Sequence, residues 1–211
     1  MDPTRRTLLI TTAATLLTPA LAYAAANPQT PSQTEGPFYP VQIPIDADAN
    51  LVNVEGMNRP ATGIQATLAG QIKDLNGCSI QHAKIEIWQC DAFGAYHHPR
   101  DRGDIAEPEF QGYGFTHTGK KGEYQFRTIR PVSYPGRTPH IHVIVSKPGM
   151  APLTTQLYVE GEPQNQRDGL FRRIPTEKQA GLLARFPQNT EESDSVIANF
   201  DIVIGYTTAC A

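Results

Sequence analysis

Eighteen prolines and 17 glycines interrupt this 211-residue chain at short intervals, which excludes long helices from most of it. Between these interruptions, apolar side chains recur at every second position, which is typical of strands with one buried face. The segments with this pattern are residues 67–73, 83–90, 123–129, 140–146, 155–159 and 200–204. Residues 176–186, which follow Pro175, favour a helix. We therefore expect a mainly-β fold: a β-sandwich core with long loops and one short C-terminal helix.

The composition also predicts how the chain is divided. Residues 27–66 are rich in proline, lack the alternation and contain the aromatic pair Phe38 and Tyr39. We expect this segment to be an N-terminal arm that packs on a sandwich domain formed by residues 67–211. The dipeptide Asn76-Gly77 separates the first two alternating segments and favours a tight turn, so these segments are expected to form a hairpin.

The first 26 residues have the layout of an export signal. Arg5 and Arg6 precede an apolar stretch that runs to about Ala22 and is followed by small residues. This stretch is shorter than the roughly 20 residues that a membrane-spanning helix needs, so no membrane anchor is expected after signal removal. The arginine pair favours the twin-arginine route, which exports folded proteins, over an ordinary secretory signal. We expect a periplasmic or secreted protein.

The net charge and the cysteine content exclude several classes of protein. The formal net charge is −3, which excludes a polybasic protein that binds nucleic acid. The three cysteines, Cys78, Cys90 and Cys210, are too few for a disulfide scaffold and are not spaced as a zinc module. Export permits one disulfide among them, and the sequence does not indicate which pair forms it.

Two histidines and two tyrosines carry the chemistry. Side chains at positions i and i+2 of a strand share a face, so His140 and His142 converge on one point, as a bound metal requires. The alternative is a pair of core histidines satisfied by hydrogen bonds. Tyr134 lies in the stiff Pro- and Gly-rich segment before them, and Tyr96 follows the strand that contains Trp88.

These donor types favour a ferric ion. No cysteine or carboxylate stands beside His140 and His142, so the usual ligand sets of zinc and ferrous iron are incomplete. A tyrosine hydroxyl has an ordinary pKa of about 10, and only a strong Lewis acid ionises it at neutral pH. Fe³⁺ is such an acid, and tyrosine is the haem-iron ligand of catalase.

Five blocks of the sequence resemble the intradiol ring-cleavage dioxygenases. Residues 68–96 (LAGQIKDLNGCSIQHAKIEIWQCDAFGAY) and 122–145 (GEYQFRTIRPVSYPGRTPHIHVIV) carry the main signature, and residues 154–161 and 167–174 follow in the same order. Residues 31–40 (PSQTEGPFYP) resemble the N-terminal segment of the α chain of protocatechuate 3,4-dioxygenases. The resemblance implies an exported, single-chain enzyme of this type.

The resemblance also implies a role for each site residue. It assigns one non-haem Fe³⁺ per chain to the ligands Tyr96, Tyr134, His140 and His142. Tyr134 would leave the metal when substrate binds and help to deprotonate it, and Arg137 would stabilise negative charge on the substrate ring. The residues implied on the substrate side are Thr34, Gly36, Pro37, Arg137 and Gln156. A surface ion pair is the alternative for Arg137, and a solvent-facing position is the alternative for Gln156.

The implied reaction is cleavage of an aromatic ortho-diol, such as catechol or protocatechuate, by O₂ to a cis,cis-muconate-type diacid. An α-type arm and a metal site in one chain favour a homo-oligomer. His97 and His98 are expected to be ordinary loop residues. Two further hypotheses fit the sequence: a secreted β-sandwich module that binds catechols or metal without turnover, and a structural sandwich whose histidines and tyrosines belong to its core.

Overall fold

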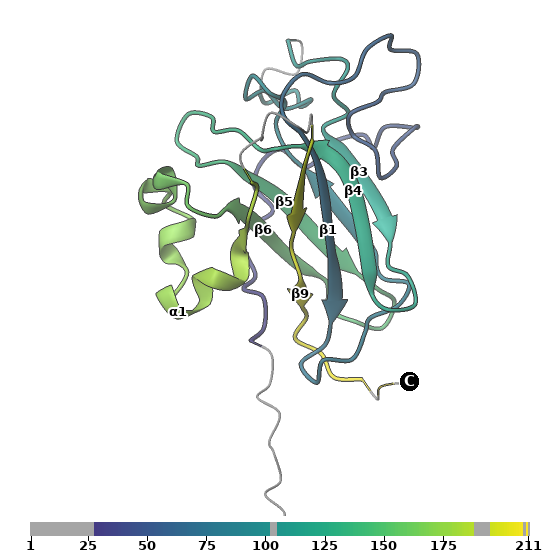
Figure 1. Ribbon diagram of the computed structural model, residues 1–211, viewed down its shortest axis with the longest axis vertical. Helices are drawn as coiled ribbons and strands as arrows, with labels where there is room; N and C mark the ends of the chain where they lie inside the picture. Colours follow the sequence, from purple (N-terminus) through teal and green to yellow (C-terminus); the bar gives the residue numbers. More distant parts are fainter. Residues whose placement is uncertain (1–27, 102–104, 188–194, 209, 211) are drawn as a thin grey trace, which may run out of the picture.

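The computed structural model describes residues 28–101, 105–187, 195–208 and 210, and it contains two β-sheets that share one core (Figure 1). The first sheet consists of β1 (Gln65–Lys73), β4 (Glu123–Ile129), β8 (Ser195–Asn199) and β9 (Ile202–Val203). The second has the order β3-β2-β5-β6-β7, with bounds Tyr113–His117, Lys84–Trp88, His140–Ser146, Leu153–Val159 and Leu183–Ala184. The mainly-β sandwich expected from the sequence is confirmed.

The second sheet is buried on both faces. The inner face contributes apolar side chains such as Ile85, Ile141 and Leu157 to the sandwich core. On the outer face, Trp88 pairs with His142 across β2 and β5, and His142 pairs with Gln156 across β5 and β6. All three are at most 1% exposed, because the arm and the loops cover this face.

The hairpin expected around Asn76-Gly77 is wrong. β1 and β2 belong to opposite sheets, although Lys73 forms an isolated antiparallel bridge with Ser79. The turn itself exists: Gly77 has a φ of 83°, and its amide donates to the Asp74 carbonyl. Alternation predicts a strand with one buried face, but both sheets bury such strands against the same core. The pattern therefore could not tell a hairpin from a crossover.

The helix expected over residues 176–186 is shorter than predicted. The α-helix α1 covers Thr176–Gln179, a 3₁₀ turn η3 covers Ala180–Leu182, and β7 follows. Parallel pairing with Tyr158 and Val159 draws Leu183 and Ala184 into the second sheet and ends the helix. In Figure 1, α1 lies beyond β6, at the edge of this sheet. The strands β3 and β8 were not predicted from the sequence.

The N-terminal arm is hydrogen-bonded to the sandwich. The Gln33 amide donates to the Thr154 carbonyl (2.8 Å), and the Thr155 hydroxyl donates to the Pro31 carbonyl (2.7 Å), so the arm runs along β6. Farther on, Leu51 and Val52 are fully buried in the sandwich core.

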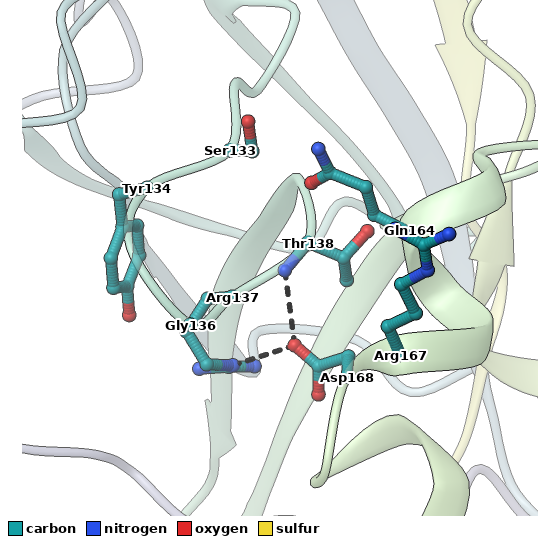
Figure 2. Close-up of a pocket in the computed structure, with 8 residues that line it drawn as sticks. All are labelled: Ser133, Tyr134, Gly136, Arg137, Thr138, Gln164, Arg167 and Asp168. Carbon is teal, nitrogen blue, oxygen red and sulfur yellow. Dashed lines mark hydrogen bonds and ion pairs between the residues drawn. The ribbon is translucent and has the colours of Figure 1, made fainter.

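The connection between β4 and β5 is tied to the segment after β6. A 3₁₀ turn η1 covers Pro163–Arg167, and a second one, η2, covers Phe171–Arg173. Asp168 lies between them and accepts hydrogen bonds from the Thr138 amide (3.1 Å) and from Arg137 (2.8 Å), as Figure 2 shows. The Thr138 hydroxyl donates to Asn165 Oδ1 (2.8 Å). The loop that carries Tyr134 is therefore attached to η1.

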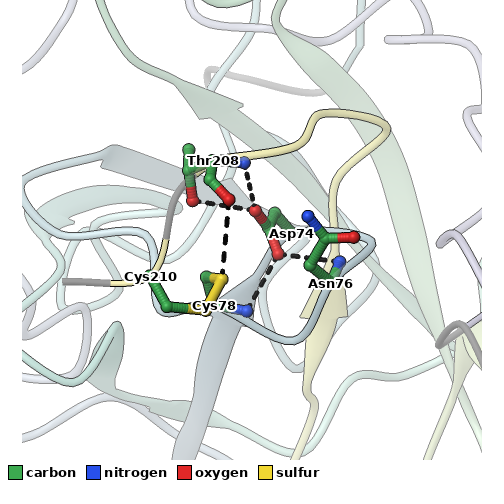
Figure 3. The surroundings of a disulfide bond; sticks show 5 residues. All are labelled: Asp74, Asn76, Cys78, Thr208 and Cys210. Carbon is green, nitrogen blue, oxygen red and sulfur yellow. Dashed lines mark hydrogen bonds between the residues drawn. A yellow bond between two sulfur atoms is a disulfide. The ribbon is translucent and has the colours of Figure 1, made fainter. Parts of the chain in front are cut away.

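A disulfide joins Cys78 to Cys210 and holds the C-terminal segment against the turn after β1 (Figure 3). The buried carboxylate of Asp74 supports this junction, because it accepts hydrogen bonds from the Cys78 amide and from the amide and hydroxyl of Thr208. Cys90 is buried and lies outside the disulfide.

The predicted export signal lies outside the described residues, among which no helix is long and apolar enough to cross a membrane.

Replacement of both Cys78 and Cys210 by serine is expected to lower the free energy of unfolding by about 3 kcal/mol, because the disulfide closes a long loop. The two cysteines are 132 positions apart. Urea unfolding of the double variant and of the oxidised protein measures the difference. Reduced wild type should unfold like the double variant, which should not respond to reductant. Equal stability of the double variant and the oxidised wild type would contradict the prediction.

Candidate metal centre

The imidazoles of His140 and His142 face one another on the outer side of β5. Ile141 between them points into the sandwich core, as the alternation of a strand requires. The two Nε2 atoms are 3.2 Å apart, and both side chains are buried. Two nitrogens that each lie ~2.1 Å from one ion are ~3 Å apart when they subtend about a right angle. The observed separation therefore fits two ligands of a single metal ion.

Neighbouring groups prepare these imidazoles for metal binding. His140 Nδ1 donates to the Thr138 carbonyl at 2.6 Å, which leaves the lone pair on Nε2. The Trp88 ring stacks on His142, with centroids 4.8 Å apart and planes inclined by 10°. Burial and the nearby Arg137 charge lower the pKa of His140 to about 3, and burial lowers that of His142 as well. Both imidazoles are therefore neutral at pH 7, as metal ligands must be.

Two tyrosines complete the donor set. Tyr96, in the loop after β2, is 5.6 Å from Tyr134 and 6.4 Å from His142 between ring centroids. Tyr134 opens a tight turn in which the Arg137 amide donates to its carbonyl (2.9 Å), and Gly136 supplies the φ of 85° that this turn needs. The turn places the Tyr134 ring 5.5 Å from that of His140.

The phenols are suited to a strong Lewis acid. The buried Tyr96 hydroxyl interacts with that of Tyr134 but makes no hydrogen bond of normal geometry to any residue that the structure describes. Burial raises the pKa of both phenols, so both are protonated at neutral pH unless a cation ionises them. Nowhere in the described part of the chain do three His, Cys, Asp or Glu residues gather as a metal site. An ion bound here would therefore use both phenol oxygens, and this set fits Fe³⁺.

Arg137 is held beside Tyr134 by two buried partners. Its Nε donates to Asp168 Oδ2 at 2.8 Å, and one terminal nitrogen donates to Gln156 Oε1 at 2.6 Å. The Asp168 side chain is fully buried, whereas that of Arg137 keeps 15% of its exposure. Burial opposes ionisation of Asp168, but hydrogen bonds from the Phe171 amide and from Arg137 keep its pKa below the ordinary value. The guanidinium is thus oriented, and it also interacts with the hydroxyls of Tyr134 and Tyr158.

The arm forms a wall of this site. Gln156 Nε2 donates to the Thr34 carbonyl at 2.9 Å, which ties the arm to β6 beside His142. Gly36 lies against His142: a Cβ at position 36 would be 3.1 Å from the imidazole Cε1. The Phe38 ring stacks on Tyr96 with centroids 4.8 Å apart. Pro37 follows on the exposed side, where its carbonyl accepts from Arg100.

The structure therefore brings together the residues that the sequence singled out. Gln156 is fully buried, so the solvent-facing alternative is wrong, and Arg137 does form an ion pair, although inside the site. His97 and His98 lie in the loop after β2, as expected, and the buried His98 contacts Phe38 and accepts the Arg100 amide. The sequence reasoning missed Asp168, whose position before Gly169 was the available signal for a turn anchor.

Comparison with known proteins identifies the family. Residues 34–205 match the profile of a family described as Dioxygenase. The chain is 32% identical over 171 residues to the β chain of protocatechuate 3,4-dioxygenase from Burkholderia cepacia, and the match covers 76% of this chain and 72% of the relative. It is 31% identical over 175 residues to hydroxyquinol 1,2-dioxygenase from Corynebacterium glutamicum, covering 73% of this chain but only 54% of that longer protein.

Solved structures agree with the sequence matches. The dioxygenase domain of a dioxygenase–carbohydrate-binding fusion from Streptomyces sp. SirexAA-E superposes with a TM-score of 0.67 at 32% identity, covering 85% of this chain and all of that domain. The family profile spans most of the chain, and the two relatives are named as dioxygenases of protocatechuate and of hydroxyquinol. The chain therefore belongs to the intradiol ring-cleavage dioxygenase family.

Proposed function

We propose that this protein cleaves an aromatic ortho-diol between its two hydroxylated carbons, with one Fe³⁺ held by Tyr96, Tyr134, His140 and His142. Both atoms of O₂ enter the product, a cis,cis-muconate-type diacid, so no external reductant is consumed. The observation that carries the proposal is the pair of imidazole nitrogens 3.2 Å apart, facing two phenols beside an oriented guanidinium. The matched relatives, named as dioxygenases of such diols, favour turnover over simple sequestration.

A ferric ion, when bound, supplies a Lewis acid that ionises the phenols and the diol hydroxyls and orients the diol. The two tyrosines have different roles. Tyr96 is 3% exposed and sealed by Phe38, so its phenol remains in place. Tyr134 lies on an exposed turn, and its pKa is raised less strongly because Arg137 opposes the effect of burial. Tyr134 Oη is therefore the atom that accepts a proton from an incoming hydroxyl.

Arg137 stabilises negative charge on the bound diol. Its Nε and one terminal nitrogen donate to Asp168 and Gln156, and the guanidinium also interacts with the Tyr134 hydroxyl, which places its charge beside the diol. Gln156 also donates to the Thr34 carbonyl, so a single amide joins Arg137 to the arm. Gly36 lets the arm backbone approach His142, and Thr34 and Pro37 flank it on the same side. This wall excludes water from one side of the diol.

Iron loading tests the ligand set. Gently purified protein is expected to contain iron and to show a visible tyrosinate-to-iron absorption band that shifts when catechol is added under air and recovers as the catechol is consumed. Tyr96→Phe and His142→Ala should lose the band and most of the iron, because each removes a donor. Tyr134→Phe is expected to keep some iron and to lower kcat/KM by about 100-fold, as loss of a proton acceptor does.

Tyr206→Phe is the matched control. Tyr206 is partly exposed, and its carbonyl accepts a hydrogen bond from the Leu75 amide, in the turn that contains Cys78 of the disulfide. Its spectrum and rate should equal those of wild type. A protein that stays colourless after loading with ferric iron would contradict the proposed ligands. A catechol-shifted band that never recovers would favour a sequestering module.

The Arg137–Asp168 pair is expected to matter for rate more than for iron binding. Arg137→Lys should lower kcat/KM by about 100-fold with unchanged iron content, because the planar donor that faces the ring is lost. Asp168→Asn should lower kcat less, since it removes the ion pair that orients Arg137 but keeps the guanidinium. Loss of iron in either variant would contradict this division.

The same pair predicts a pH dependence of stability. The Asp168 pKa is lower in the folded protein than in the unfolded chain, so the ionised carboxylate stabilises the fold above the unfolded pKa, and this contribution is lost as the pH falls through the folded pKa. The difference in unfolding free energy between wild type and Asp168→Asn should therefore be constant from pH 7 to about 5 and shrink below about pH 4. Urea unfolding across this range measures it, and a difference that grows in acid would refute it.

We further propose that the protein is exported by the twin-arginine route and acts in the periplasm or outside the cell. The Cys78–Cys210 disulfide supports an oxidising compartment. Fused to a reporter that is exported only when folded, residues 1–30 should direct export, and replacement of Arg5 and Arg6 by lysine should abolish it. Export of the lysine variant at the wild-type level would refute the twin-arginine route. Homo-oligomerisation remains a prediction from the sequence.

A further inference from the structure

A cavity of about 270 Å³ begins at Tyr134 and Arg137 and continues past them to η1. Figure 2 shows the Tyr134 ring on one side of this cavity and Gln164 and Arg167 on the opposite side, with Arg137 and Asp168 between them. Gly136 also lines the cavity, and a Cβ at that position would meet nothing within 4 Å, so this wall is open. A benzene-sized ring fits a cavity of roughly 150 Å³, so the space exceeds what one ring needs.

The far wall is rigidly placed relative to the metal centre. Two buried residues, Asn165 and Asp168, bind Thr138, which lies two positions before His140. Asn165 Nδ2 also donates to the Val159 carbonyl at the end of β6 (2.9 Å). These contacts hold η1 against the loop that carries Tyr134. The exposed side chains of Gln164 and Arg167, one turn apart on η1, therefore stand at a set position from the site.

The charge of the cavity comes from Arg167. Arg137 and Asp168 neutralise one another, with 2.8 Å between Nε and Oδ2. Arg167 forms no ion pair with any carboxylate in the described part of the chain. The cavity therefore offers one uncompensated positive charge, beside the amide of Gln164 and the hydroxyl of Ser133. Such a set recognises a carboxylate better than an alkyl group.

We propose that this cavity is the subsite for the ring substituent of the substrate, and that Arg167 selects ortho-diols whose substituent ends in a carboxylate. The inference rests on the proposed function, because it places the diol beside Tyr134 and Arg137. The substituent extends from the ring, past Gly136, towards η1. Arg167 is a specificity residue here, and the ring-cleaving groups do not depend on it.

The test compares two substrates of equal length, 3-(3,4-dihydroxyphenyl)propanoate and the neutral 4-propylcatechol. Wild type is expected to favour the acid in kcat/KM by about fivefold or more, the value of one partly exposed charged hydrogen bond. Arg167→Gln should abolish this preference by lowering kcat/KM on the acid about fivefold and much less on 4-propylcatechol. Arg167→Lys should retain part of it, and high salt should weaken it. Arg173→Gln, which removes an exposed arginine of η2, is the matched control and should behave as wild type.

Calorimetric binding of two phenols that cannot be cleaved, 3-(4-hydroxyphenyl)propanoate and 4-propylphenol, gives a readout independent of turnover. Wild type should bind the acid more tightly, and Arg167→Gln should bind the two equally.

If diols are cleaved but neither assay shows an Arg167-dependent preference, the subsite is wrong and the proposed function stands. If no diol is cleaved while the binding preference is present and is lost in Arg167→Gln, the proposed function is wrong and the anion subsite stands. An equal loss on both substrates would also overturn the subsite, because Arg167 would then act only on the fold.

Discussion

The two-residue period of β5 is the constraint on which the rest of this structure depends. It directs Ile141 and Val143 into the sandwich core and turns His140 and His142 to the opposite face of the same strand. Packing of the apolar residues thereby determines where the imidazoles point. A shift of one residue in register would exchange the two sets, placing histidines in the apolar core. The stability of the core and the geometry of the candidate metal centre therefore depend on the same contacts.

A polar site on the outer face of a sheet must still be covered and satisfied. Buried polar groups cost free energy unless they are hydrogen-bonded, and the protein meets this demand with segments from outside the sandwich. Asp168 neutralises Arg137, Thr138 binds His140, and the arm carbonyl of Thr34 accepts from Gln156. Two atoms of the ligand candidates are exceptions: His142 Nδ1 has no hydrogen-bond partner among the described residues, and the Tyr96 hydroxyl lacks a normal hydrogen bond at the point where a metal would bind it.

The covering segments also give the site its asymmetry. On one side the arm approaches closely, with Gly36 against His142 and Phe38 against Tyr96. On the other side the tight turn through Gly136 leaves a cavity bounded by η1. The backbone of Gly36 and the ring of Phe38 close the first side, while the second side ends at the long, charged and exposed side chain of Arg167. In the proposed function, the closed side holds the reacting ring, and the open side distinguishes chemically different substituents.

Local periodicity and turn chemistry determined much of this protein from the sequence alone. The alternation predicted the sandwich and the strand that contains His140 and His142, because the two faces of a strand depend on neighbours in the chain. That these donors hold a ferric ion stays a prediction from their chemistry. Sheet membership, the early end of α1, the Cys78–Cys210 pairing and the role of Asp168 depend on residues far away in sequence. Only the tertiary structure could decide them, because a strand, a helix end or a buried carboxylate takes its partner from whatever packing brings beside it.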